Sequence, residues 1–263
     1  MNNNLIKSKL NNNILHLMLN DKENQNTLSD EMINELDKRL TDASQDNHVK
    51  VIILSSTGKV FCAGHNLKDL HSKRLDSDKG KSYYEKLFKS CSLLMMNIVY
   101  NAKPVIAAID GIATAAGCQL IASCDLAYAS NQAKFATPGV NIGLFCSTPM
   151  VALSRSVGKK SAMEMLLTGD LINAKKAYEI GLINNFFEPE ALMEKVFKQA
   201  EKISMKSMKT LKIGKKAFYK QKEISLEDAY NYTSKVMTEN MLEKDAEEGI
   251  AAFLEKRKPN WDH

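Results

Sequence analysis

The sequence contains no apolar stretch long enough to cross a bilayer, which needs about 20 consecutive apolar residues. Residues 1–6 also lack the apolar core of a signal peptide and the arginine-rich amphipathic pattern of a transit peptide. No internal repeat is present, which argues against solenoid architectures. We therefore expect no membrane partner and a cytoplasmic location, in a bacterial cytosol.

Patterns that hold metals, nucleotides or disulfides are also missing. The chain has only five cysteines, an odd number without a Cys-x-x-Cys pair, which is typical of reduced thiols in a cytosol-like compartment. No spacing of His, Cys, Asp or Glu fits a metal site, and no GxGxxG motif occurs. We therefore expect no metal and no permanently bound cofactor.

Acidic and basic residues nearly balance, with 36 Lys and Arg against 31 Asp and Glu and a formal net charge of +5. The densest basic segment, residues 206–222, alternates lysine with apolar residues at helical spacing. This pattern favours a solvated amphipathic helix over a nucleic-acid-binding surface, and we expect no nucleic-acid partner. The same lysines would suit an acidic ligand such as a nucleotide phosphate.

Strand and helix patterns alternate up to residue 188, and only helical patterns follow. Continuous apolar runs predict strands that are buried on both faces of a parallel sheet, and shorter or alternating runs predict the others, over residues 14–19, 51–54, 105–109, 125–129, 134–136 and 184–187. Periodic apolar residues predict helices over residues 29–46, 83–100, 116–123, 149–157, 160–167 and 174–180. The charged residues 68–81 predict a mobile surface loop. The sequence thus predicts an α/β core followed by a helical module.

Residues 111–125 are the most distinctive segment. Gly111 ends the strand 105–109, and small residues then lead into a short apolar helix over 116–123. The first N–H groups of a helix have no internal partner and carry partial positive charge, so a buried start lined by Ala and Gly can bind an oxyanion. Gln119, the one strongly polar side chain in this helix, should lean over the helix start. Tight packing alone is the alternative interpretation, which this segment leaves open.

Two glycine-bearing loops, residues 61–67 and 110–120, each follow a predicted buried strand. This pair, in this order, resembles the crotonase (enoyl-CoA hydratase/isomerase) superfamily. Further matches extend the resemblance over nearly the whole chain, at residues 124–130, 135–138, 142–144, 167–169, 174–182 and 253–259. Three segments are more narrowly similar to one branch of the superfamily, at residues 114–120, 135–141 and 143–149.

The resemblance implies a spiral of ββα turns over residues 1–198 that binds an acyl-coenzyme A thioester, with coenzyme A entering as part of the substrate. It implies a helical oligomerisation region over residues 199–263 that builds a homotrimer or a homohexamer. By motif position, the two backbone N–H groups that polarise the thioester carbonyl belong to His65 and Ala116. Contacts with coenzyme A are implied for Lys22, Ala63, His65, Lys215 and Phe218.

The chain departs from the superfamily at two acid–base positions. Hydratases of the superfamily carry two glutamates, whose positions are occupied here by Gln119 and Gly139. A carboxamide neither gives nor takes a proton near neutral pH, although it can orient a water molecule. Each acid–base group contributes about 10²–10⁴-fold in rate, so we expect hydration to be much weaker and thioester binding to persist.

Three functions stay open after this departure. The chain is an enoyl-CoA hydratase or isomerase of fatty acid metabolism, a catalytically weak or inactive pseudoenzyme that binds acyl-CoA, or a coenzyme A thioester hydrolase. The third would use Cys146 as a nucleophile or a water held by Gln119. The resemblance points Asn141, Cys146 and Ser147 toward the pocket, and the imidazole of His65 is a further candidate base.

Overall fold

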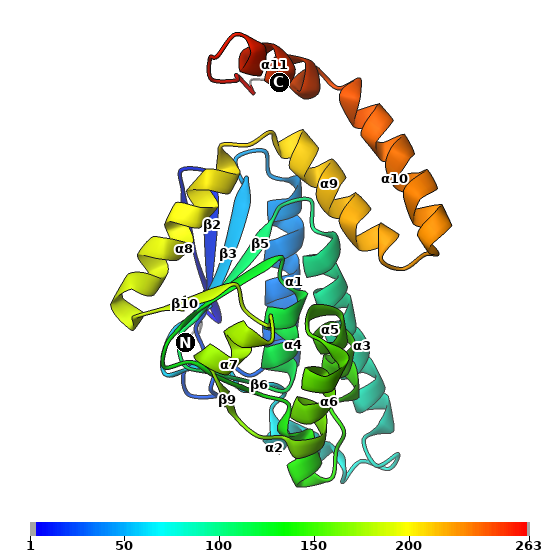
Figure 1. Ribbon diagram of the computed structural model, residues 1–263. Helices are drawn as coiled ribbons and strands as arrows, with labels where there is room; N and C mark the ends of the chain where they lie inside the picture. Colours follow the sequence, from blue (N-terminus) through cyan, green and yellow to red (C-terminus); the bar gives the residue numbers. More distant parts are fainter. Residues whose placement is uncertain (1–3, 262–263) are drawn as a thin grey trace.

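The computed structural model describes residues 4–261 and contains two β-sheets (Figure 1). The larger sheet has six strands in the order β1-β2-β3-β5-β7-β10. Their bounds are Ile6–Asn11 for β1, Ile14–Leu19 for β2, Val51–Ser56 for β3, Val105–Ile109 for β5, Leu126–Ser130 for β7 and Asn185–Phe187 for β10. β1 pairs antiparallel with β2, and the remaining neighbours are parallel.

The smaller sheet has four strands in the order β4-β6-β8-β9. Their bounds are Val60–Cys62 for β4, Ile112–Thr114 for β6, Lys134–Ala136 for β8 and Ile172–Asn173 for β9. The chain alternates between the sheets, because β3, β5 and β7 are followed at once by β4, β6 and β8, and a helix then leads to the next turn. This succession confirms the predicted α/β spiral of ββα turns.

Helices cover both faces of the larger sheet. The first four residues of β3 are apolar, and they face both sides of the sheet: Ile52 and Leu54 pack into the main core, whereas Val51 and Ile53 pack against α8. The helices of the spiral are α1 (Asp30–Gln45), α2 (Leu67–Lys73), α3 (Lys81–Tyr100), α4 (Ala116–Ser123), α5 (Ser147–Ser156), α6 (Lys159–Thr168), α7 (Ala174–Glu179) and α8 (Pro189–Ser204), with the 3-10 turn η1 (Pro138–Ile142) before α5.

Three further helices end the chain, α9 (Met208–Gln221), α10 (Leu226–Met241) and α11 (Lys244–Leu254). α9 lies against α3, whereas α10 and α11 extend away from the sheets (orange and red in Figure 1). Their apolar side chains are largely exposed, as at Tyr230 (69%) and Phe253 (82%). The predicted boundary between residues 198 and 199 falls inside α8, and the division into two regions stays a prediction.

The prediction of a mobile loop over residues 68–81 is wrong for its first half. α2 occupies Leu67–Lys73, and its start is fixed because the side chain of Asn66 accepts a hydrogen bond from the amide of Lys68. The strand β1 was not predicted, because five of its six residues are exposed and give no apolar pattern. In the described part of the chain, no helix is long and apolar enough to cross a membrane.

Candidate functional site

The start of α4 is shaped by an unusual backbone turn at Ala115. This residue has φ +50° and ψ −117°, a conformation that costs free energy in any residue with a Cβ atom. The turn is held on both sides, since the amide of Ala115 donates to the carbonyl of Ala136 at 3.0 Å and its own carbonyl accepts from the amide of Gln119 at 3.0 Å. The amide of Ala116 thus becomes the first free donor of a buried helix.

The first glycine-bearing loop lies directly against this helix start. Gly64 has φ +89°, and a Cβ atom added to it would lie 3.0 Å from the Cβ of Ala115 and 3.3 Å from the amide nitrogen of Ala116. The hydroxyl of Thr114 ties the two loops together by donating to the carbonyl of Ala63 at 3.1 Å. Within residues 4–261, neither the amide of His65 nor that of Ala116 donates a hydrogen bond. The structure therefore brings both predicted oxyanion donors onto adjoining loops.

The imidazole of His65 has a defined tautomer. Its Nδ1 lies 3.0 Å from the carbonyl oxygen of Leu28, which can only accept, so Nδ1 carries the hydrogen and Nε2 carries the lone pair. Nε2 is buried without a partner among the described residues, and the ring meets the edge of Phe88. Burial lowers the pKa of His65 and keeps the ring neutral. The imidazole is a base by its chemistry, but it does not line the cavity described next.

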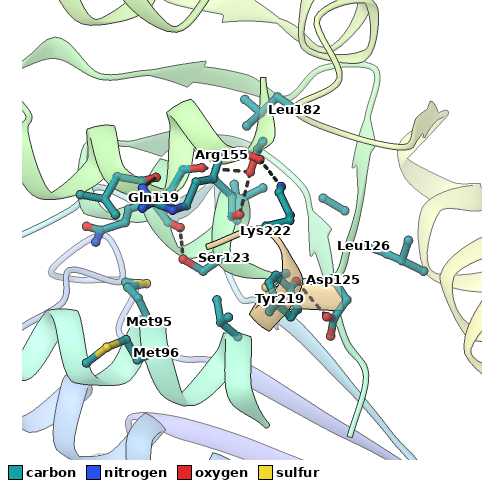
Figure 2. Close-up of a pocket in the computed structure, with 18 of the residues that line it drawn as sticks. Met95, Met96, Gln119, Ser123, Asp125, Leu126, Arg155, Leu182, Tyr219 and Lys222 are labelled. Carbon is teal, nitrogen blue, oxygen red and sulfur yellow. Dashed lines mark hydrogen bonds between the residues drawn. The ribbon is translucent and has the colours of Figure 1, made fainter. Parts of the chain in front are cut away.

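Gln119 opens onto a cavity of about 640 Å³ between α3, α4, α5 and α9 (Figure 2). The residue is only 4% exposed, and its Oε1 has no hydrogen-bond partner in the described part of the chain. A buried amide oxygen without a partner costs free energy unless a ligand or water supplies a donor. Apolar walls come from Met95, Met96, Val99 and Val151, and further polar lining comes from Ser123, Asp125, Arg155, Tyr219, Lys222 and Glu223.

Gly139, the second expected glutamate position, is closed. A Cβ atom added there would lie 2.5 Å from the carbonyl oxygen of Leu144 and 2.9 Å from the sulfur of Cys146. The thiol of Cys146 thus fills the space that a side chain at position 139 would need. Burial raises the pKa of Cys146, although a backbone hydrogen bond at Gly139 opposes the shift. A thiol held in its protonated form is a poor nucleophile.

Asn141, Cys146 and Ser147 do not line the cavity. The amide of Asn141 packs beside Gly169, where an added Cβ atom would meet its Nδ2 at 3.0 Å, and the exposed hydroxyl of Ser147 donates to the carbonyl of Phe145. The turn from η1 into α5 directs Asn141 toward the C-terminal end of α6. The expectation that the three side chains point toward the thioester pocket stays a prediction.

The residues predicted to contact coenzyme A have different surroundings. Ala63 donates its amide to the carbonyl of Gln25 at 3.2 Å, and Lys22 is an exposed side chain whose stem would contact a Cβ atom at Gly58. Phe218 lines the cavity and is 55% exposed. The roles of Lys22, Ala63 and Phe218 stay predictions.

Lys215 is the exception, and its predicted role is corrected. Its ammonium donates to the carbonyls of Ile98 and Lys103, both at 3.0 Å, and to a carboxylate oxygen of Asp125 at 2.7 Å. These three bonds use every donor of the ammonium group, and its side chain is 9% exposed. Burial lowers the pKa of Lys215, while Asp125 opposes the shift. Lys215 anchors α9 to the core and has no donor left for a phosphate.

Sequence reasoning missed the charged residues at the other end of the cavity. Arg155 on α5 pairs with Glu223 just beyond α9 at 3.0 Å, and Lys222 donates to the carbonyl of Arg155 at 3.1 Å (Figure 2). The hydroxyl of Tyr219 donates to Asp125 at 3.0 Å, and burial raises its pKa. Nothing in the local sequence signals this group, because Arg155 and Glu223 are 68 residues apart.

Comparisons with known proteins identify the family and the fold of the chain. The family model for enoyl-CoA hydratase/isomerase matches residues 9–263. The mitochondrial enoyl-CoA hydratase domain-containing protein 3 of Xenopus laevis is 46% identical over 250 residues, which cover 95% of this chain and 83% of that protein. The Xenopus laevis relative belongs to the branch of the superfamily that residues 114–120, 135–141 and 143–149 of this chain resemble.

Two crystal structures of similar proteins have the same fold as this chain. That of human enoyl coenzyme A hydratase domain-containing protein 3 is 44% identical with a TM-score of 0.92, and the match covers 98% of this chain and 100% of that one. That of an enoyl-CoA hydratase from Mycobacterium smegmatis is 42% identical with a TM-score of 0.93, and the match covers 98% and 99%. The predicted superfamily and fold are therefore confirmed.

The expected bacterial cytosol is wrong. The Xenopus laevis relative and its counterparts from Homo sapiens, Rattus norvegicus, Mus musculus and Danio rerio are all named as mitochondrial proteins. These names indicate a mitochondrial location. The expectation failed because it relied on missing targeting patterns and on reduced cysteines, and reduced thiols do not distinguish between these compartments.

Proposed function

Because this chain belongs to the enoyl-CoA hydratase/isomerase family, we propose that it binds acyl-coenzyme A thioesters and polarises the thioester carbonyl with the amides of His65 and Ala116. One observation supports the proposal above all others. The loops that carry these two amides are in contact, and neither amide donates a hydrogen bond within the described residues. Fixed N–H donors that have no partner of their own are what an oxyanion-stabilising site requires.

Coenzyme A would lie along the loops that present Lys22, Ala63 and His65, with Phe218 on the cavity wall. Lys215 is excluded from this set because its ammonium is saturated. No permanently bound cofactor takes part. The names of its relatives indicate a mitochondrial location, and we propose that the protein acts there in fatty acid metabolism.

Hydration or isomerisation would be slow at this site. The cavity offers Gln119 where a hydratase of this family has a carboxylate, and Gly139 offers no side chain. Gln119 can accept a hydrogen bond from a water molecule through Oε1 and hold it near the bound acyl chain, but it cannot remove its proton. The amides of His65 and Ala116 would still stabilise developing negative charge on the thioester oxygen.

The test removes the carbonyl oxygen from the ligand, because a backbone amide has no simple substitution. Calorimetry would compare butyryl-CoA with its thioether analogue S-butyl-CoA, which lacks that oxygen. We expect the thioester to bind about tenfold more tightly and its carbonyl stretch to shift to lower frequency in infrared difference spectra. Equal affinity without a spectral shift would contradict the proposal.

A second candidate function is an acyl-CoA-binding protein without turnover. It is favoured because both carboxylates that line the cavity are already paired with other side chains. The cavity is lined by two carboxylates among the described residues, and both are paired, Asp125 with Lys215 and Tyr219, and Glu223 with Arg155. Turnover of crotonyl-CoA by the purified protein decides between the two candidates. A rate no higher than that of Gln119→Met would favour the binding protein.

The Cys146 route of the hydrolase alternative receives no support from the geometry, because Cys146 is buried, has a pKa raised by burial and lies outside the cavity lining. A homotrimer or homohexamer remains our proposal for the assembly, with the exposed apolar side chains of α10 and α11 as the expected contact surface. Light scattering of the purified protein would measure its oligomeric state. A monomer at micromolar concentration would contradict the proposed trimer or hexamer.

A further inference from the structure

We propose that the cavity beside Gln119 holds an acyl chain that ends in a carboxylate, and that Arg155 and Lys222 bind this carboxylate. The ligand class is thus an ω-carboxyacyl thioester of coenzyme A. This inference rests on the proposed function, because it assigns the chain that the same thioester carries.

The cavity has two chemically different ends. Gln119, Met95 and Met96 lie on one side of the view in Figure 2, whereas Lys222, Tyr219 and Asp125 lie toward the other. The lining also contains the apolar side chains of Val99, Val151 and Leu182, which suit methylene groups. A simple fatty acyl chain would place its terminal methyl beside the charged groups of Lys222, Arg155 and Glu223, where the surroundings are only partly apolar, as at Phe218.

The charges at the far end favour an anion. Asp125 is neutralised by Lys215, whose ammonium lies 2.7 Å away. Arg155, Lys222 and Glu223 remain, with one net positive charge. Lys222 has no carboxylate within ion-pair distance among the described residues, since its ammonium donates to the carbonyl of Arg155 and lies 5.5 Å from the ring centre of Phe218. One ligand carboxylate would neutralise the net positive charge at this end of the cavity.

A ligand carboxylate can displace Glu223 from its ion pair with Arg155. Both side chains are 52% exposed, and ion pairs of that exposure contribute little to stability. Arg155 donates from Nε at 3.0 Å and from Nη2 at 3.4 Å to the two oxygens of Glu223, which is the fork that a ligand carboxylate would occupy. Glu223 therefore acts as an internal competitor for the site.

The length of α4 sets the length of the chain. The proposed thioester site lies at Ala116, about one turn before Gln119, where the cavity lining on α4 begins, and this lining extends to Asp125, just beyond the end of the helix. Eight residues at 1.5 Å per residue span about 12 Å. A chain of medium length would bridge this distance, and we take the octanoyl and octanedioyl chains as the matched pair for the test.

Calorimetry on the full chain would compare octanoyl-CoA with octanedioyl-CoA, which differ only at the far end. We expect octanedioyl-CoA to bind about tenfold more tightly, because a charge-assisted hydrogen bond replaces a methyl group among polar groups. Arg155→Met and Lys222→Met should each reduce this preference. Glu223→Gln should increase it, since the internal competitor loses its charge, and a merely structural role for Glu223 would not produce that increase.

Lys220→Met is the matched control, because Lys220 lies on the same helix with its ammonium over the ring of Tyr232 and does not line the cavity. It should leave the preference unchanged. If the wild-type protein binds both thioesters equally, or if Lys220→Met lowers the preference as much as Lys222→Met, the inference is overturned and the proposed function stands. If neither thioester binds, the proposed function itself fails.

Discussion

Gln119 and Gly139, the two positions where the resemblance implies glutamates in hydratases, have opposite surroundings in this protein. Gln119 lines a cavity of about 640 Å³ with an unsatisfied oxygen, whereas Gly139 is closed by the carbonyl of Leu144 and the thiol of Cys146. The two losses therefore differ in kind. Position 119 presents an amide to an open cavity, whereas position 139 has no space for a side chain. One position can be restored by a single substitution, and the other cannot.

The strongest test of this contrast is Gly139→Glu. The new Cβ atom would meet a backbone oxygen at 2.5 Å, which cannot move without displacing the turn, and we expect a loss of about 3 kcal/mol in the free energy of unfolding. Urea denaturation would measure it. Gly158→Glu is the control, because a Cβ atom there meets nothing within 4 Å. Similar losses for the two variants would mean that position 139 is not closed.

The second test is the gain of function expected from Gln119→Glu. The side chains have the same shape, and the new carboxylate would face the cavity with a lone pair able to take a proton from water. We expect the hydration of crotonyl-CoA to rise about 10²-fold, the lower limit for an acid–base group. Gln119→Met removes the polar atoms at similar volume and should give no increase. A rate for Gln119→Glu that equals that of Gln119→Met would show that position 119 is not near the reacting carbons.

The third test compares the reactivity of two thiols, Cys118 on the helix that carries Gln119 and Cys146 beside Gly139. Burial raises the pKa of Cys118, on α4, to about 12, and a backbone hydrogen bond limits the shift at Cys146. Since the thiolate is the reactive form, we expect N-ethylmaleimide to modify Cys146 at least about tenfold faster than Cys118, at a rate that rises with pH. Peptide mass spectrometry over time would measure this. Modification of Cys118 first would mean that α4 opens more readily than the turn at Gly139.

The smallest expected effect concerns His65, on the loop that contacts the start of α4. Burial lowers its pKa, so below its ordinary value of 6.5 the unfolded chain takes up a proton that the folded protein does not. The contribution of the neutral ring to stability is thus complete above that value and is lost as the pH falls through the lowered pKa. His65→Gln should flatten this acid slope in urea titrations between about pH 5 and pH 7.5. His16, whose pKa is also lowered by burial, should keep part of the slope in the variant. An unchanged slope would contradict the burial of the His65 ring.

The sequence predicted the fold and the contact of the two glycine-bearing loops, but it did not predict the cavity. The loops are recognisable from local sequence, because each follows a run of apolar residues and carries a glycine, Gly64 or Gly111, that adopts a positive φ. The resemblance implied a contact between Lys215 and coenzyme A, but the side chain of Lys215 is buried in an ion pair. Its partners Ile98, Lys103 and Asp125 lie on elements about a hundred residues away in the chain, and only packing brings them together.

By itself, then, the sequence determined the family, the spiral and the absence of both glutamates, because these depend on residue identity and on patterns within a few turns of chain. Only the tertiary structure decided that the space at Gly139 is filled, that Lys215 is an anchor, and that Arg155, Lys222 and Glu223 share one end of a cavity. These features depend on distances between segments far apart in the chain. Such distances are set by how the helices pack on the two sheets, and no local pattern records them.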